Sequence, residues 1–145
     1  MTVFKGTLTG KVVAARIRPG RDLLHALEEL VRDSGFGNGV VELVGSVRKA
    51  RLACYDQARK EYIEFSLEEP LEIVTGLGNV SLKDGKPFVH VHLTLSDERG
   101  KCYGGHLVRG TETFVAEVFV SEVAMEPPMS RTRDDETGLM LWLPY

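Results

Sequence analysis

Residues 88–95 read FVHVHLTL, residues 96–101 read SDERGK and residues 102–107 read CYGGHL. The first segment is rich in β-branched and other apolar residues, the second is polar with a glycine, and the third resumes with further strand-forming residues. This order predicts a β-hairpin. Because successive side chains of a strand point to opposite faces, His90 and His92 share one face of it.

The position of His106 on this hairpin depends on the loop. A three-residue loop of residues 98–100, with Gly100 in the left-handed conformation, is a common hairpin connection. It places His106 opposite His92 on the same face, with the Cβ atoms about 5 Å apart. His90 then lies diagonally, roughly 7–8 Å away.

Two other arrangements of the hairpin would remove His106 from this cluster. A two-residue loop would turn its side chain to the opposite face. A bulge at the glycine pair 104–105 would also change the register. The sequence alone leaves these alternatives open.

Three imidazoles that converge from two adjacent strands are suited to a three-ligand metal site with an open fourth position. Zinc, or another divalent ion that prefers imidazole, is the expected occupant. The competing interpretation is that these are half-buried strand residues satisfied by hydrogen bonds, which explains most isolated His-x-His patterns. The third histidine favours the metal site. Such a site could be catalytic, activating a bound water, or structural, tying together the hairpin or a subunit interface.

Length and composition indicate one ordinary domain. The chain has 145 residues, of which 43% are hydrophobic and 27% charged, with a formal net charge of −3. A free-standing nucleic-acid binder usually carries a basic surplus, so this charge counts against that role. No apolar run is long enough to span a membrane, and residues 1–5 show no secretory signal. We therefore expect a cytoplasmic protein, with no membrane partner and with Cys54 and Cys102 as free thiols.

The remaining pattern predicts one helix among many strands. Asp22 is suited to cap the start of the helix, and Gly35 to end it. Outside the histidine hairpin and its leading turn 84–85, we expect strands at residues 3–8, 11–18, 39–47, 49–56, 60–67, 71–75 and 111–125. The result is an α+β domain with seven or eight mostly antiparallel strands. The tail ends in an apolar segment, residues 139–143, that requires burial.

Other motifs point to no further chemistry. The glycine pair 104–105 lacks the helix and the Lys-Ser/Thr of a phosphate-binding loop. The RPGR at 18–21 lacks the order of an AT-hook. No nucleophile arrangement can be identified. If the metal site is catalytic, the candidate general bases are acidic residues chosen by type alone: Glu72, Asp97, Glu98 and Glu117.

Seven short motifs, in their order and spacing, carry a resemblance to a known family: RPG at 18–20, DL at 22–23, GSV at 45–47, LEIV at 71–74, GNVS at 78–81, PFVHVH at 87–92 and GGHL at 104–107. Together they resemble the PPC ("plants and prokaryotes conserved") domain. The resemblance covers a core of residues 3–125. The tail, residues 126–145, contains a DETGL segment that is typical of stand-alone prokaryotic members. The whole chain, 1–145, is thus expected to be a single domain.

The resemblance implies a multi-stranded, mainly antiparallel sheet with a barrel-like core and one prominent helix, assembled as a homotrimer. In plant members the domain follows AT-hooks, and a Phe-Glu-Ile-Leu-like segment serves association with itself and with other transcription factors. The matching self-association segment here consists of Leu71, Glu72, Ile73 and Val74. The AT-hook is absent. The histidines at 90, 92 and 106 resemble the metal-binding histidines of the prokaryotic branch.

Two functions follow as hypotheses. The first is a homotrimeric, DNA-associated or regulatory protein that holds a divalent metal ion, with DNA or a DNA-binding protein as its further partner. The second is a small metal-dependent enzyme, of hydrolase or lyase type, that uses the open coordination position.

Overall fold

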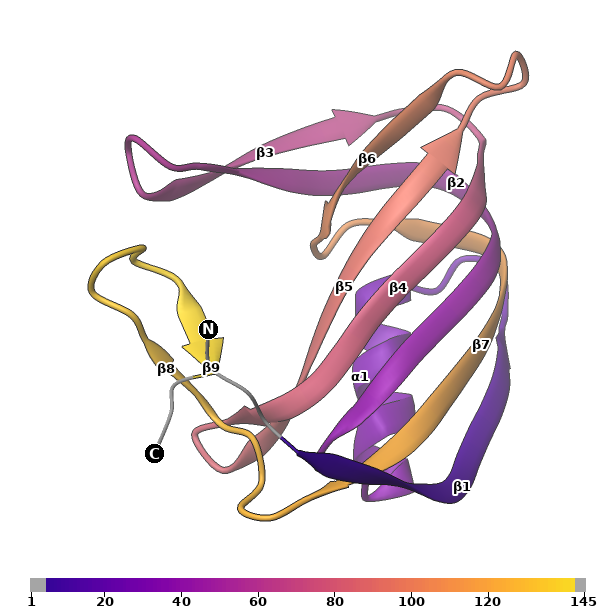
Figure 1. Cartoon of the computed structure of the whole chain (residues 1–145). Helices are drawn as coiled ribbons and strands as arrows, with labels where there is room; N and C mark the ends of the chain where they lie inside the picture. Colours follow the sequence, from indigo (N-terminus) through magenta and orange to yellow (C-terminus); the bar gives the residue numbers. More distant parts are fainter. Residues whose placement is uncertain (1–4, 143–145) are drawn as a thin grey trace.

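The computed structural model describes residues 5–142, which form one helix and nine strands (Figure 1). In chain order the elements are β1 (Gly6–Ile17), α1 (Leu23–Ser34), β2 (Gly39–Asp56), β3 (Glu61–Leu67), β4 (Leu71–Lys83), β5 (Lys86–Ser96), β6 (Cys102–Leu107), β7 (Glu112–Met125), β8 (Arg131–Arg133) and β9 (Met140–Trp142). This confirms the mostly antiparallel α+β fold with a single prominent helix.

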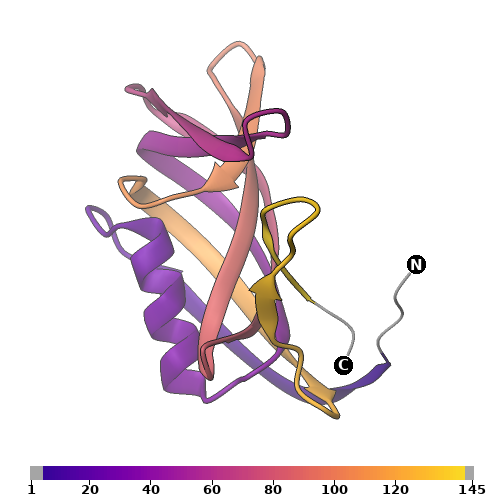
Figure 2. The ribbon, with the colours of Figure 1, turned by 90° about the vertical axis from the view of Figure 1, so that its left-hand side faces the viewer.

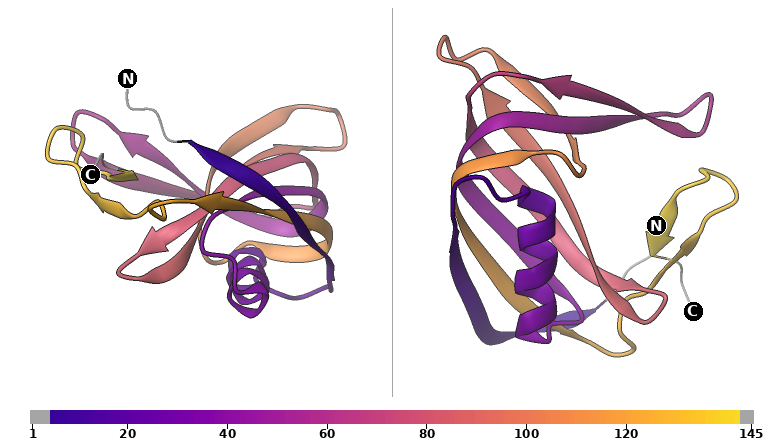
Figure 3. Two further views of the ribbon diagram at one scale, coloured as in Figure 1. Left: turned by 60° about the horizontal axis from the view of Figure 1, so that its bottom comes forward. Right: turned by 180° about the vertical axis from the view of Figure 1, so that it is seen from behind.

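Seven of the strands form one antiparallel sheet in the order β1-β7-β2-β4-β5-β6, with β3 paired to β2. The long strand β2 pairs with β7 and β4 over its first part and with β3 over its second part. It also pairs with β6 at Leu52 and Ala53. Because β6 already pairs with β5, strands β2, β4, β5 and β6 close into a ring, which gives the core its barrel-like character (Figure 3).

Helix α1 covers one face of the sheet. Asp22 caps its start by accepting a hydrogen bond from the backbone N–H of His25 at 2.8 Å. Gly35 ends it in the left-handed conformation, with φ of 74°. Both predicted helix boundaries are therefore confirmed. The apolar stripe of the helix is buried in the main core together with the inward-facing side chains of the strands: Leu23, Leu27 and Val31.

The opposite face of the sheet is partly covered by the β8–β9 hairpin (Figure 2). Figure 2 shows α1 and this hairpin on opposite sides of β4 and β5. The hairpin gives the apolar residues of the tail a partly buried position, Leu139 to Trp142 all being intermediate in exposure. Leu143, the last residue of the predicted apolar segment, lies outside the described residues.

Several strands are longer than predicted. The segments expected at 3–8 and 11–18 form a single strand, β1, whose register shifts between Leu8 and Val12 around Gly10. Residues 3 and 4 lie outside the described range. The segments at 39–47 and 49–56 likewise join into β2, and 71–75 continues into β4 through residue 83. In β1 the register shift around Gly10 accommodates the break, whereas Gly76 and Gly78 of β4 pair in regular register with Leu43 and Val41 of β2.

Between residues 5 and 142, no helix has both the length and the apolar character needed to cross a membrane.

Candidate metal centre

The β5–β6 hairpin has the three-residue loop that the sequence favoured. The backbone N–H of Asp97 donates to the carbonyl of Lys101 at 3.0 Å, and Gly100 adopts φ of 78°. The Asp97 carboxylate also accepts the backbone N–H groups of Arg99 and Lys101, each at 2.9 Å. With the loop held in this way, His106 pairs directly with His92.

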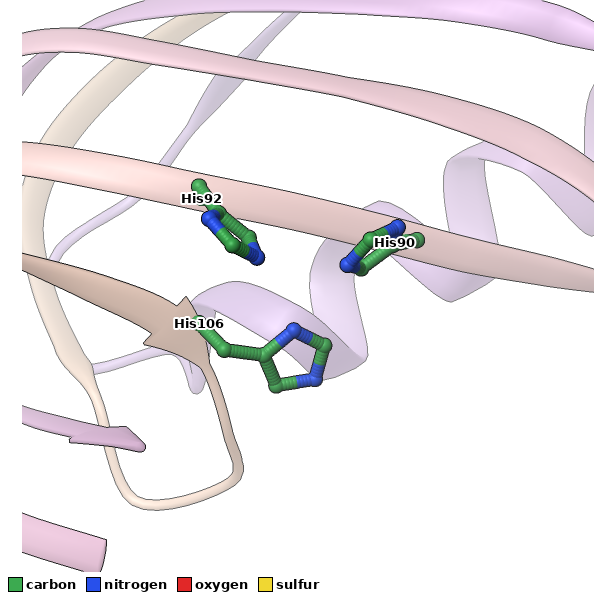
Figure 4. A group of neighbouring side chains, drawn as sticks. All are labelled: His90, His92 and His106. Carbon is green, nitrogen blue, oxygen red and sulfur yellow. The ribbon is translucent and has the colours of Figure 1, made fainter. Parts of the chain in front are cut away.

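The three histidine side chains converge on one region (Figure 4). His90 and His92 project from β5 and His106 from β6, and one ring nitrogen of each lies within 4.8 Å of the others. The ring centroids are 4.9 to 5.4 Å apart. His90 and His106 are half-buried, and His92 is exposed. This group could hold a metal ion.

Two of the imidazoles are held neutral by their surroundings. Burial, followed by the charge of Arg131 and the neighbouring histidines, lowers the pKa of His90 to about 4. Burial, His92 and Arg131 also lower the pKa of His106. A neutral imidazole keeps a lone pair for a cation, so both rings are suited to be ligands at pH 7.

One polar atom of the cluster supports a bound cation. The Nδ1 atom of His106 is buried and has no hydrogen-bond partner among residues 5–142. An unpaired buried nitrogen is costly, and a metal ion would satisfy it. Three imidazoles fit zinc and similar divalent ions, and they leave a fourth position for another ligand.

Arg131 of β8 lies beside this cluster and was not predicted from the sequence. Its Nη2 atom is 3.3 Å from Nδ1 of His90 and donates to Oδ1 of Asn79 at 2.8 Å. Its Nε donates to Oγ of Ser81 at 2.8 Å, and its Nη1 to the carbonyl of Met140 at 2.9 Å. The side chain is thus fixed against β4, β5 and β9.

A cavity of about 300 Å³ opens next to His90 and His106. Its wall is built from the β2–β3 hairpin, the end of the β4–β5 hairpin and the tail. The remaining lining residues are Tyr55, Lys60, Glu61, Tyr62, Lys83, Phe88, Arg131, Gly138, Leu139, Met140 and Leu141. The ring of Tyr62 is 5.1 Å from that of His106. Burial raises the pKa of Tyr62, so its hydroxyl stays protonated at neutral pH and can donate a hydrogen bond.

The other residues considered in the sequence lie elsewhere. None of the four predicted general bases lines this cavity, and Glu61 is the one carboxylate among its described lining residues. Cys102 is exposed and pairs with Ser96, away from the histidine cluster. His25 lies on α1 beside Glu29. No spacing rule pointed to Glu61, Tyr62 or Arg131, because only the folding of separate hairpins brings them to the histidines.

The predicted self-association segment alternates between core and surface. Leu71 and Ile73 are buried, whereas Glu72 and Val74 are exposed. Only the two exposed side chains are thus available to a partner. The role of this segment in association remains a prediction.

Comparisons with solved structures show close relatives across the whole chain. A metal-containing protein from Archaeoglobus fulgidus is 42% identical, with a TM-score of 0.91, and the match covers 99% of this chain and 100% of that one. A plant- and prokaryote-conserved protein from Pyrococcus horikoshii is 33% identical, with a TM-score of 0.90 over 100% of this chain and 99% of that one. A protein from Ralstonia eutropha that is named as a candidate DNA-binding protein is 27% identical, with a TM-score of 0.78 over 97% and 96%.

A curated relative is the bifunctional protein GlmU from a Synechococcus strain, which is 36% identical over 131 residues. The match covers 90% of this chain but 20% of that protein, so the chain spans about a fifth of the length of the curated relatives it matches. The family model of the Plants and Prokaryotes Conserved (PCC) domain matches residues 5–124. The chain therefore belongs to the Plants and Prokaryotes Conserved domain family.

Proposed function

We propose that this protein is a homotrimeric regulatory domain with a zinc ion held by His90, His92 and His106, and that the open coordination position of the ion receives a small molecule. The observation that carries the proposal is the convergence of three imidazoles beside a cavity, with the Nδ1 atom of His106 buried and unpaired among the described residues. The relative from Archaeoglobus fulgidus, named a metal-containing protein, supports it.

The residues around the proposed centre would have different roles. The three histidines bind the ion, which when present supplies positive charge to polarise an oxygen atom of a ligand. The hydroxyl of Tyr62, beside His106, can donate a hydrogen bond into the cavity. The tail and the β2–β3 hairpin form walls of this cavity.

Elemental analysis of the purified protein tests the metal centre. We expect one zinc per chain, and its loss in His92→Ala, because two imidazoles bind a divalent ion much more weakly than three. His92 is exposed, so this variant should keep its fold. His25→Ala, which removes an exposed histidine from α1, serves as the matched control and should retain the metal. A wild-type protein that binds no divalent ion when zinc is supplied would contradict the proposal.

The exposed side of the sheet supports self-association. Leu77 and Phe119 both pair with Glu42, one from each side, and both are exposed by more than half. Val40 and Val44, two positions to either side of Glu42 on β2, are also exposed. Together these four apolar side chains form a patch, called here the β2 patch. An apolar patch of this kind is typical of a subunit interface.

Association with DNA is the part of the regulatory proposal that is supported by a relative's name. The net charge of −3 limits any such contact to a local surface or to a DNA-binding partner protein. A filter-binding titration against salt tests it directly. We expect retention at low ionic strength that falls as salt rises, because phosphate contacts release counterions. No retention at low ionic strength would exclude direct DNA binding.

A metal-dependent enzyme is the second candidate, favoured by the presence of Glu61 and Tyr62 in the cavity next to the metal centre. These side chains could move a proton to or from a bound substrate. The two candidates differ in turnover. If the zinc-loaded protein converts a compound in a metabolite panel and His92→Ala does not, the enzyme is favoured. Ligand binding without conversion favours the regulatory domain.

A further inference from the structure

Arg131 is a buried guanidinium that has only neutral partners in the described part of the chain. It is 8% exposed, and its hydrogen bonds go to a hydroxyl, an amide oxygen and a backbone carbonyl. None of the salt bridges formed within residues 5–142 includes it. The rings of Phe88 and Trp142 lie 5.3 and 5.5 Å from the guanidinium carbon. A buried positive charge without an anionic partner is unusual, because burial normally requires pairing.

The contact between Arg131 and His90 cannot persist when His90 binds a metal ion. Arg131 can only donate, so Nδ1 of His90 must accept in the 3.3 Å contact. If the metal binds at Nδ1, that lone pair is used. If it binds at Nε2, the ring proton moves to Nδ1, which then becomes a donor facing a donor. Metal binding through either nitrogen therefore frees an N–H group of Arg131.

A second N–H group of Arg131 is already available. A guanidinium has five N–H donors, and the contacts with Ser81, Met140, Asn79 and His90 account for four of them. With the metal bound, two donors are without an acceptor among the described residues. A planar guanidinium with two free donors is suited to a carboxylate or a phosphate.

The charged side chains that line the cavity also favour an anionic ligand. They are Lys60, Lys83 and Arg131 on the positive side and Glu61 on the negative side. Glu61 is also within 3.8 Å of the guanidinium of Arg59, which lies outside the lining. A divalent ion would add two further positive charges. This concentration of positive charge occurs in a chain whose net charge is −3.

We propose that the metal centre and Arg131 together bind a small organic carboxylate, which neutralises both. This inference rests on the proposed function, because it requires the three histidines to hold a metal ion. The cavity volume of about 300 Å³ is at the lower end of ligand pockets, which restricts the ligand to a small molecule. Phe88 and the apolar residues Leu139 and Leu141 line the same cavity and provide a surface for a carbon skeleton, which inorganic phosphate lacks.

Calorimetric titration of the zinc-loaded protein with malonate tests this proposal. Malonamide, which has the same shape but no charge, is the control ligand, and inorganic phosphate is the second anion. We expect malonate to bind at least tenfold more tightly than either. Metal-free wild-type protein should bind malonate at least tenfold more weakly, because it lacks the metal charge and Arg131 remains bonded to His90.

Two variants assign the binding to the cavity. Zinc-loaded Arg131→Met should lose at least tenfold in malonate affinity while keeping its metal, measured by elemental analysis before and after the titration. If this variant does not fold, Lys83→Met, which alters a lining residue held over the ring of Phe88, should weaken binding about threefold. Arg99→Met removes a fully solvated guanidinium from the β5–β6 loop and should leave the affinity unchanged.

Substitution of cobalt(II) for zinc supplies an independent readout, since malonate should change the visible spectrum of the ion. The proposal is overturned if malonamide or phosphate binds as tightly as malonate, if metal-free protein binds it equally well, or if Arg131→Met retains both metal and full malonate affinity. Failure of the proposed function gives a different result, namely no metal in the wild-type protein.

Discussion

At the scale of single residues, the guanidinium of Arg131 is the positive charge beside the three clustered histidines. Arg131 contacts His90, and its charge adds to the effect of burial in lowering the pKa values of both His90 and His106. The same charge repels a metal ion, and the same contact must break before His90 can bind one. In the proposed centre, Arg131 therefore opposes metal binding in the absence of an anion and supports it when an anion is present.

This repulsion predicts the direction in which zinc affinity changes when Arg131 is replaced. Arg131→Met should bind zinc about tenfold more tightly than wild type in buffer free of carboxylates, because a neighbouring positive charge has been removed. Competition with a zinc chelator measures the affinity, and Arg99→Met is the control. Weaker zinc binding in Arg131→Met would mean instead that Arg131 serves mainly to hold His90 in place.

At the scale of elements, the position of His106 depends on close contact between β6 and β2. Gly105, its neighbour in β6, has no room for a side chain: a Cβ atom there would lie 2.9 Å from the carbonyl oxygen of Ala53 and 3.2 Å from Cβ of Leu52. The pairing of β6 with these two residues closes the strand ring. The glycine thus permits the close approach that sets His106 beside β5.

Gly105→Ala should consequently weaken zinc binding and lower the free energy of unfolding by about 1–3 kcal/mol, because the backbone of β2 must move to admit the methyl group. Urea denaturation and zinc competition measure the two effects. Gly37→Ala is the matched control, since a Cβ atom there meets only a side-chain atom of Leu82 at an ordinary 3.7 Å. Unchanged metal affinity in Gly105→Ala would show that the β2–β6 contact does not position the site.

At the scale of the whole molecule, the two faces of the sheet differ in what they contact. One face packs against α1 and forms the core. The other carries the histidine cluster and the β2 patch, and the two adjoin because Leu77 of the patch pairs directly with His92. A subunit interface built on the β2 patch would thus border the metal centre.

Leu77→Glu should dissociate the proposed homotrimer into monomers, since it buries a carboxylate in an apolar interface next to Glu42. Sedimentation velocity measures the oligomeric state. Arg32→Glu, which introduces the same group on the exposed side of α1, should leave the assembly intact. If Leu77→Glu remains a trimer, the interface lies elsewhere on the molecule.

The sequence determined those features that depend on local geometry. Alternation of side chains along residues 88–95 placed His90 and His92 on one face, and Gly100 favoured the loop that brings His106 opposite His92. Asp22 and Gly35 marked the ends of the helix, because capping involves neighbours in the chain. Each of these features is governed by residues a few positions apart.

Only the tertiary structure decided what surrounds the histidines. Arg131 reaches His90 across 41 residues of sequence, and Tyr62 reaches His106 across 44, through hairpins whose packing no local pattern specifies. The continuity of β1 and β4 was also hidden, because a glycine that suggests a break in the sequence can lie within a strand once neighbouring strands supply the hydrogen bonds: β1 shifts register around Gly10, and Gly76 and Gly78 pair regularly with β2. Local geometry thus placed the three histidines, while long-range packing supplied the charge and the cavity beside them.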